Sequence, residues 1–536
     1  MSKRQAESAP GCGWGARVVA GVLVAAALLC LAAFLAAARA DAAQLPKLHV
    51  SGKKIRDSYG RQVILRGVND TSLTDQYQVN PSLPTVVPLT DEDYDRMQGY
   101  GFNVLRLGVS WSRLEPERGE IDDAYIQQIA GVIQKAADHG MYTVINMHDA
   151  GWGKYPASTP ETKCPEGLRL SHGWHGAPKW ATFPGDKTTC HDDKTIKRTP
   201  AVRSAWTKFW RNFKPHSWGK DARGIQQHLV WVWGTLSRAF AHNSAVAGYD
   251  ILNEADPGYI GRHELSKRIS QFDRRAITSI RRSEHRARGF SHMVFFEPNL
   301  TWAQQGLRSH SPRPGFSHDG NLVFAPHLYG RDVHTTDRPV SGVRRDLKHQ
   351  AERVTRLSAK YHSPWWIGEW SFSPFDHDSL KKLLAHIRIQ DSHQLGSAWW
   401  QWSVACGSPQ TFDGLDPKPS YRILGTINRV KCPHAVPQPD PKRWRGIIAR
   451  AYPRAAPGHL TDLRARGAKM RLKGKSKCTR AFRHRKPRSC KLVVWVPNPK
   501  RPKVGGQHLG HIRKTRQRGG WTVTANVKRN YMLRTR

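Results

Sequence analysis

Acidic side chains are scarce in this chain. Against 85 Lys and Arg residues, the 536 residues include only 42 Asp and Glu, so the formal net charge is +43. The imbalance is greatest in residues 441–536, where 29 Lys or Arg accompany one acid, Asp462, and supply 28 of the 43 net charges. Such a charge predicts attraction to polyanions: anionic lipid headgroups, acidic cell-wall polymers, sialylated glycolipids or nucleic acid.

Motifs that read the bases of nucleic acids are missing as well. Clusters of Lys and Arg bind any phosphate backbone, but they give no sequence specificity by themselves. We therefore do not expect a specific nucleic-acid partner. We expect a monomer whose basic C-terminal region contacts an anionic membrane or cell-wall surface, with Arg480–Arg488 as the densest patch of charge.

Cysteine is infrequent, and none of the eight cysteines has the spacing of a zinc site. No metal or organic cofactor is implied. Six cysteines remain after an N-terminal apolar segment, and six allow about 15 pairings. Proximity in the chain favours three disulfides, each closing a short loop: Cys164 with Cys190, Cys406 with Cys432, and Cys478 with Cys490.

The N-terminus has the features of an export signal. Basic residues up to Arg17 precede the apolar run Val18–Ala38, and small residues follow it. The run is also long enough to span a bilayer. The sequence therefore predicts that residues 1–43 are a signal peptide or an N-terminal membrane anchor. The rest would be secreted or extracytoplasmic, with anchoring through residues 18–38 as the alternative.

Residues 44–436 alternate between short apolar strands and amphipathic helices. Asn103–Leu107 and Tyr142–Met147 are typical strands, and apolar residues recur at helical spacing between them until Gly140. Six further strands are expected at Val63–Val68, Val246–Leu252, Met293–Phe296, Leu322–Ala325, Trp365–Ile367 and Ser397–Trp402. Eight such units predict an α/β fold, a (β/α)8 TIM barrel.

Two further regions depart from this alternation. Gly151–Gly224 is too long for an ordinary connection, and long loops after barrel strands usually shape a binding site. Residues 437–536 contain the β-rich segments Lys491–Val496 and Trp521–Val527. They predict a small, strongly basic all-β domain with a sandwich-like fold.

Two glutamates stand at the ends of predicted strands. Glu254 and Glu369 each follow an apolar run, and in a barrel such residues gather at the catalytic face. Glycoside hydrolysis requires two carboxyl groups that face each other across the sugar. Other polar residues are expected at the same face, and they are Arg106, His148, Asn253, His327 and Tyr329.

Six ordered motifs resemble those of glycoside hydrolase family 5. They contain Asn69, Arg106, His148, Asn253-Glu254, His327-Leu328-Tyr329 and Gly368-Glu369-Trp370. Within the family, Gly176–Ala181, Trp400-Gln401-Trp402 and Arg450–Ala455 are most similar to segments of endoglycoceramidases and related glycolipid β-glycosidases.

The resemblance implies a role for each of these residues. Glu254 is expected to be the acid/base and Glu369 the nucleophile, held ionised and oriented by Arg106 and Tyr329. The expected substrate contacts also include Asn69, His148, Asn253 and His327, with Trp400 or Trp402 stacking under the sugar. Both tryptophans are expected on one strand face.

The chain departs from the family pattern at two places. Ala255 follows the expected acid/base, where the family usually has proline. Glycolipid enzymes of this type typically read Asp-Met-His-Gln-Asp at the third strand, whereas this chain has Asn146-Met147-His148-Asp149-Ala150. A sugar-binding carboxylate is therefore missing or displaced by one position.

The leading functional prediction is a retaining hydrolase that cleaves a β-glycosidic bond in a glycolipid by double displacement. The expected partner is accordingly a glycolipid or an oligosaccharide. A β-glucanase or mannanase acting on polysaccharide is an alternative with the same chemistry. A non-catalytic, carbohydrate-binding protein of the cell envelope is an alternative from another class.

Overall fold

The computed structural model describes residues 45–77, 82–192, 198–220, 222–305, 310–329, 338–374, 376–409, 425–428, 430, 432, 442–478 and 488–536. The predicted signal or anchor segment lies outside these residues, as does Arg480–Arg488 apart from its last residue. Among the helices of the described part, none has the length and hydrophobicity needed to cross a bilayer.

Eight parallel strands form the central sheet, in the order β10-β11-β4-β5-β6-β7-β8-β9. The two ends of this order meet, because Phe324 of β9 bridges in parallel to Trp365, just before β10. The predicted α/β barrel is thus confirmed. The strands are β4 (Arg66–Leu73), β5 (Val104–Val109), β6 (Tyr142–Met147), β7 (Val246–Asp250), β8 (Met293–Phe296), β9 (Leu322–Phe324), β10 (Ile367–Trp370) and β11 (Ser397–Trp399).

The first and last predicted barrel strands need correction. The first barrel strand begins at Arg66, while Val63 belongs to a short strand of another sheet, β3 (Gln62–Val63). Strand β11 ends at Trp399, three residues before the predicted end. A short apolar run does not indicate which of two sheets it joins, because its side chains would be buried in either sheet.

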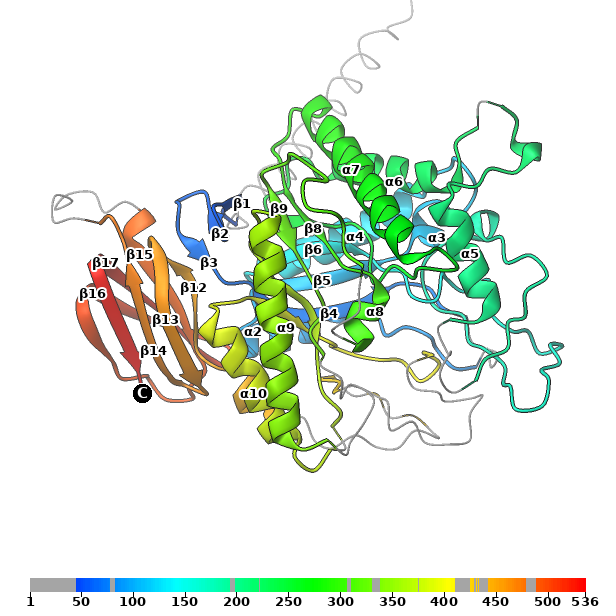
Figure 1. Cartoon of the computed structure of the whole chain (residues 1–536). Coiled ribbons are helices and arrows are strands. Elements are labelled where there is room, and N and C mark those ends of the chain that lie inside the picture. Colours follow the sequence, from blue (N-terminus) through cyan, green and yellow to red (C-terminus); the bar gives the residue numbers. More distant parts are fainter. Residues whose placement is uncertain are drawn as a thin grey trace, which may run out of the picture. The chain divides into compact units, whose positions relative to one another are not determined.

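Helices lie around the outside of the barrel (Figure 1). Helix α4 (Asp123–Asp138) shows why they form: its apolar residues recur every three or four positions and are buried against the strands. Asp122 caps the helix by accepting a hydrogen bond from the backbone N–H of Tyr125 at 2.8 Å. The other helices are α2 (Asp91–Gly99), α3 (Trp111–Leu114), α5 (Pro200–Trp210), α6 (Ile225–Ala239), α7 (Arg262–Arg286), α8 (Leu300–Gln305), α9 (Val340–Lys360), α10 (Ser379–Ser392) and α11 (Lys442–Ile448).

The long insertion connects β6 to β7, and its described part contains both buried and exposed segments. It contains α5 and the predicted disulfide between Cys164 and Cys190. The other two predicted disulfides, Cys406–Cys432 and Cys478–Cys490, also form. Disulfides of this kind are typical of proteins that fold in an oxidising compartment.

A second sheet is entirely antiparallel and contains the C-terminal strands. Its core is a separate cluster of apolar side chains that includes Leu472, Val494, Trp495 and Leu533. The predicted segments Lys491–Val496 and Trp521–Val527 lie in its two central strands. The C-terminal strands are β12 (Tyr452–Ala456), β13 (His459–Arg466), β14 (Lys469–Lys475), β15 (Lys491–Val496), β16 (Val504–Gln517) and β17 (Gly520–Thr535).

Three N-terminal strands extend this second sheet. They are β1 (Leu48–Ser51), β2 (Lys54–Asp57) and β3, and β3 joins β12 by pairing Val63 with Ala455. The sheet also packs against the end of the barrel near Gly101, whose φ of +80° suits glycine. A Cβ at Gly101 would lie 2.0 Å from the indole nitrogen of Trp495, so only glycine permits this approach.

Candidate active site

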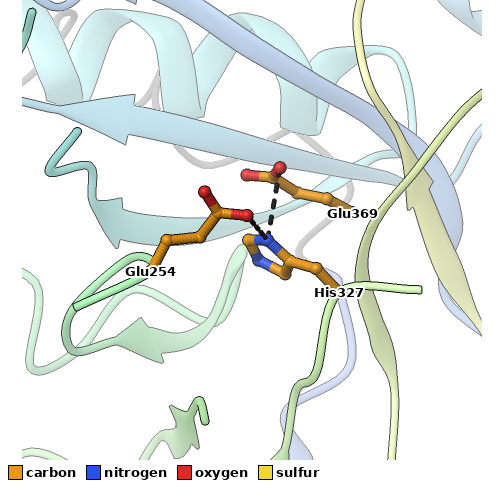
Figure 2. A group of neighbouring side chains, drawn as sticks. All are labelled: Glu254, His327 and Glu369. Atoms are coloured by element: carbon orange, nitrogen blue, oxygen red, sulfur yellow. Dashed lines mark hydrogen bonds and ion pairs between the residues drawn. The ribbon is translucent and has the colours of Figure 1, made fainter. Parts of the chain in front are cut away.

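The polar residues predicted for the site gather at the carboxyl ends of the barrel strands. Glu254 follows β7, His327 follows β9, and Glu369 lies within β10 (Figure 2). Parallel strands end at one face of a barrel, so residues far apart in the chain meet there. The described residues therefore place both predicted carboxylates at the barrel mouth.

His327 lies between the two carboxylates. Its Nδ1 is 2.8 Å from Oε1 of Glu254 and 3.3 Å from Oε2 of Glu369. One oxygen of each carboxylate and the imidazole nitrogen all lie within 4.8 Å of one another. Retaining glycosidases place their two carboxyl groups about 5 to 5.5 Å apart. The closeness of this pair therefore fits a retaining reaction.

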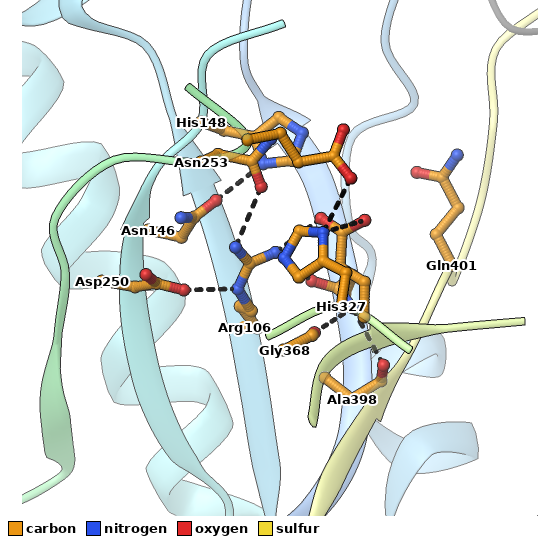
Figure 3. A network of polar contacts seen from close by, with 12 residues as sticks. Arg106, Asn146, His148, Asp250, Asn253, His327, Gly368, Ala398 and Gln401 are labelled. Carbon is orange, nitrogen blue, oxygen red and sulfur yellow. Dashed lines mark hydrogen bonds and ion pairs between the residues drawn. The ribbon is translucent and has the colours of Figure 1, made fainter. Parts of the chain in front are cut away.

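Arg106 is a fully buried cation that joins the strand ends (Figure 3). Burial alone would lower its pKa, but the carboxylates of Asp250, Glu297 and Glu369 outweigh burial and raise it above its usual value. The guanidinium is therefore charged at every physiological pH. It donates to Asp250 (2.8 Å), Asn69 (2.9 Å), Glu369 (2.7 Å), Asn253 (3.0 Å) and Glu297 (2.7 Å).

Both oxygens of Glu369 receive a hydrogen bond. Arg106 donates to Oε1 at 2.7 Å, and the hydroxyl of Tyr329 donates to Oε2 at 2.6 Å. Burial raises the pKa of Tyr329 well above 10, and the charges of Glu369 and Glu254 raise it further. Tyr329 therefore remains a proton donor. Donors on both oxygens hold the side chain of Glu369 in one orientation.

Glu254 is held less tightly than Glu369. Its side chain is 12% exposed, whereas that of Glu369 is 4% exposed. Its backbone has a φ of +38°, a conformation that is rare for residues other than glycine and is often found at functional sites. The backbone N–H of Glu254 donates to Oε2 of Glu297 at 3.1 Å, which stabilises this conformation.

Glu297 is a site residue that the sequence analysis missed. It directly follows β8 and is buried. Besides its bonds to Arg106 and the Glu254 backbone, its Oε1 lies 3.2 Å from Nε2 of His327. The signal that could have found it is the one used for Glu254 and Glu369, an acid at the end of an apolar strand.

Acids on both sides of the ring hold His327 in its charged form. Burial alone would lower the pKa of His327, but the charges of Glu297 and Glu369 and the hydrogen bond to Glu254 raise it well above 6.5. An imidazolium has a proton on each ring nitrogen and can donate to both sides. His327 therefore offsets the repulsion that would otherwise separate the carboxylates.

Asn69 and Asn253 are engaged within the protein. The amide nitrogen of Asn69 donates to the Gly368 carbonyl at 3.1 Å, and its oxygen accepts from Arg106. The amide nitrogen of Asn253 donates to the carbonyl of Asp149 at 3.0 Å, and its oxygen also accepts from Arg106. Both asparagines therefore orient the cation at the barrel mouth.

The two predicted stacking tryptophans have different surroundings. Trp400 stacks on His148, with ring centroids 5.2 Å apart, and His148 Nδ1 lies 2.6 Å from Oδ1 of Asn146. Trp402 is fully buried, and its Nε1 donates to Asp93 at 3.1 Å. The expectation of a shared strand face was wrong, because β11 ends before either tryptophan. Trp400 is the one beside the site.

Asp149, the acid displaced by one position, is buried behind His148. Burial raises its pKa well above 3.8, although a hydrogen bond from the backbone of Trp152 opposes that rise. Oδ1 of Asp149 makes no hydrogen bond with the described residues. This carboxyl group is thus a candidate for a neutral, protonated acid beside the site.

Within the described residues, Glu254, His327 and Glu369 are the cluster whose atoms are close enough to hold a metal ion. The donor set does not suit one, because Arg106 and a protonated His327 already supply positive charge to these carboxylates. The expectation that no metal takes part stays a prediction.

Comparisons with known proteins show what the chain as a whole resembles. The chain is 28% identical over 295 residues to endoglycoceramidase I of Rhodococcus hoagii, and the aligned region covers 54% of each chain. It is 23% identical over 309 residues to the endoglycoceramidase of Cyanea nozakii, and this alignment covers 54% of this chain and 58% of that one. The chain thus spans about half the length of these curated relatives.

Solved structures match over more of the chain. A crystal structure of endogalactoceramidase superposes with a TM-score of 0.79 at 34% identity, over 92% of this chain and 100% of that one. Endo-glycoceramidase II from Rhodococcus sp. has a TM-score of 0.68 at 18% identity, over 90% and 98% respectively, and shows the same fold. The family model for cellulase (glycosyl hydrolase family 5) matches residues 57–405, more than half of the chain, and the protein therefore belongs to that family.

Proposed function

We propose that this protein is a retaining glycoside hydrolase that cleaves the β-glycosidic bond between sugar and lipid in a glycolipid. The observation that supports this most strongly is the pair of carboxylates at the barrel mouth, with Glu369 held by two donors and Glu254 more exposed. Catalysis by such a pair requires one carboxylate and one acid, and these surroundings favour that assignment.

In the first step, Glu369 attacks the anomeric carbon while Glu254 gives its proton to the glycosidic oxygen. The bond between that carbon and the leaving oxygen breaks, and the lipid alcohol departs with the proton. A glycosyl ester then joins the sugar to Glu369. In the second step, Glu254 takes a proton from water, whose oxygen attacks the same carbon and releases Glu369.

Positive charge near Glu369 stabilises the steps of this cycle in which Glu369 or Glu254 is a carboxylate. Arg106 and Tyr329 stabilise the carboxylate before attack and after its release. His327 also lies against both carboxylates, so it can stabilise Glu254 when it has lost its proton. We propose Trp400 and His148 as contacts for the sugar, and Asn69, Asn253 and Trp402 as residues that hold the surrounding structure.

The proposed lipid substrate rests on the relatives. Endogalactoceramidase matches along nearly the whole chain, and the curated relatives include three endoglycoceramidases. We therefore propose a sugar linked to ceramide as the substrate. The departure at Asn146 and Asp149 from the glycolipid-enzyme pattern favours testing galactose as well as glucose at the cleaved bond.

Two variants, compared with wild type on two types of substrate, test this function. Wild type, Glu254→Gln and Glu369→Gln are assayed on fluorescent galactosylceramide and glucosylceramide and on cello-oligosaccharides, with release of ceramide or sugar as the measurement. We expect cleavage of a ceramide glycoside by wild type and a loss of about 10³-fold or more in either variant. Cleavage of the oligosaccharides alone would reject the lipid substrate.

A slow fluorinated glycoside identifies the nucleophile independently. A 2-fluoro sugar with an activated leaving group should leave a covalent adduct on the peptide that contains Glu369, detected by mass spectrometry. No adduct should form on Glu369→Gln. An adduct on any other residue would overturn the assignment.

We also propose a monomer that acts outside the cytoplasm, secreted or anchored through residues 18–38. The three disulfides support an oxidising location. The proposed division is a signal or anchor at 1–43, a catalytic barrel domain at 44–436 and a basic β domain at 437–536 that contacts an anionic surface, with strands β1 to β3 of the barrel domain extending the sheet of the β domain. Salt-sensitive binding to anionic vesicles tests this contact.

A further inference from the structure

Basic residues stand opposite one another on three adjacent strands of the C-terminal sheet. Strand pairing places Arg464 of β13 against Arg471 of β14, and Arg471 against Arg534 of β17. Residues paired in this way lie on the same face, with side chains about 5 Å apart. Three arginines thus form a row across the sheet.

A second row lies beside the first. Arg466 pairs with Lys469 on the neighbouring strand, and each is two residues from an arginine of the first row. Arg536 follows the described end of β17 and is two residues from Arg534. Because side chains two apart in a strand share a face, all six basic residues lie on one side of the sheet.

This face of the sheet is turned away from the core. Leu463, Leu472 and Leu533 alternate with the basic residues and are buried in the cluster on the other side. The basic face borders a cavity of about 990 Å³ that residues of α10, among them Arg388, also line. We call this cavity the basic groove, and its basic residues are Arg388, Arg464, Arg466, Lys469, Arg471, Arg534 and Arg536.

The two acids that line the groove are already paired. Asp391 is buried and bonded to Arg66 and Arg450, both outside the groove, and it accepts the backbone N–H of Ala465. Asp462 is paired with Arg471 at 2.8 Å. Asp462 also lies 3.6 Å from Arg464. Among the described residues, no acid lies within ion-pair distance of the other five basic residues of the groove, which are Arg388, Arg466, Lys469, Arg534 and Arg536.

Like charges placed directly opposite across strands repel one another and destabilise a sheet. A bound anion removes that repulsion. Guanidinium groups form two parallel hydrogen bonds to a phosphate, and a row at strand spacing presents several such groups together. The groove therefore has the charge and the donors that an anionic phosphate group requires.

We infer that the basic groove binds the phosphate headgroup of an anionic phospholipid. The exposed positions of Arg464, Lys469 and Arg534 on three neighbouring strands suit a headgroup presented by a bilayer surface. The inference deepens the proposed surface contact of the C-terminal domain by naming its site and its ligand. It does not depend on glycosidase activity.

Two full-length triple variants with the same loss of charge test the inference. The groove variant is Arg464→Gln, Arg471→Gln and Arg534→Gln. The control is Lys491→Gln, Arg513→Gln and Lys528→Gln, which changes exposed strand residues outside the groove. Binding is measured by co-sedimentation with vesicles of phosphatidylglycerol and phosphatidylcholine, with pure phosphatidylcholine vesicles as the neutral reference, and circular dichroism melting confirms that each variant folds.

The groove variant should bind the anionic vesicles about tenfold or more weakly than wild type, and the control variant less than about threefold more weakly. Pyrophosphate should compete with the vesicles for wild type. An equal loss of vesicle binding in both variants would overturn the assignment of the binding site to the groove and leave only a diffuse contact. No binding by wild type would reject both the groove and the surface contact. Binding of pyrophosphate without binding of vesicles would overturn the assignment to a membrane lipid.

Discussion

The hydroxyl of Tyr329 donates a hydrogen bond of 2.6 Å to Oε2 of Glu369. Arg106 donates to the other carboxylate oxygen, Oε1. One oxygen of the proposed nucleophile thus depends on a neutral donor and the other on a cation. The two contributions can be separated by substitution, because a phenylalanine fits the place of Tyr329 without its hydroxyl.

Tyr329→Phe should lower kcat/KM on a soluble aryl β-glycoside by about 10- to 100-fold, because Oε2 loses its donor and the attacking carboxylate is held less well. The melting temperature should change little. Tyr259→Phe, at an exposed position, is the matched control. A Tyr329→Phe enzyme as active as wild type would show that the hydroxyl does not contribute.

Glu254→Ala should separate the two chemical steps. A dinitrophenyl leaving group departs without a proton, so the glycosyl ester forms, but water then lacks its base. We expect a burst of dinitrophenol followed by slow turnover, observed by stopped-flow absorbance. A ceramide leaving group should give no burst, and Glu369→Gln should give none with either substrate. A burst from Glu369→Gln would reverse the assigned roles.

Asp149→Asn should stabilise the protein increasingly as the pH rises. Burial raises the folded-state pKa of Asp149 above 3.8, so the folded protein binds this proton more tightly than the unfolded chain does. The contribution of this proton to the free energy of unfolding is complete below about pH 3.8 and is lost as the pH rises through the folded-state pKa. Asparagine resembles the protonated acid and keeps no such dependence.

Urea unfolding of wild type and Asp149→Asn at several values between pH 4 and pH 8 checks this. The difference in the free energy of unfolding should grow by on the order of 1 kcal/mol in favour of asparagine toward high pH. A difference that is constant with pH would mean that Asp149 ionises as readily in the folded protein as in the unfolded chain.

Gly101→Ala should loosen the packing of the C-terminal sheet against the barrel. The new Cβ would lie 2.0 Å from the Trp495 indole, and the backbone φ of +80° adds strain. We expect a loss of about 3 kcal/mol or more in unfolding free energy. Gly119→Ala has a similar φ of +91° but open space around its Cβ, so it isolates the backbone contribution, which should be about 1 kcal/mol. Equal losses would contradict the proposed clash.

The sequence predicted the barrel and most of the residues at its mouth because each motif is local. A strand followed by an acid, as at Glu254 or Glu369, can be recognised without knowing what lies opposite. Glu297 has the same local pattern but was missed, because it lies in none of the family motifs that the sequence resembles. Its role depends on Arg106, 191 positions away.

Other features depend on pairings that no local pattern specifies. Val63 was expected in the barrel and instead pairs with Ala455, almost 400 residues later in the chain. The row of Arg464, Arg471 and Arg534 exists because three strands align in a particular register. In the sequence it appears only as an excess of positive charge. Trp400 and Trp402 likewise differ because the strand stops before them.

Arg106 reaches five partners because its guanidinium carries donors in three directions within one plane. A lysine at this position would preserve the charge, but its single nitrogen could not reach Asp250, Glu297 and Glu369 at the same time. The acids left over would then repel each other at the mouth of the barrel. At this position the shape of the side chain therefore matters as much as its charge.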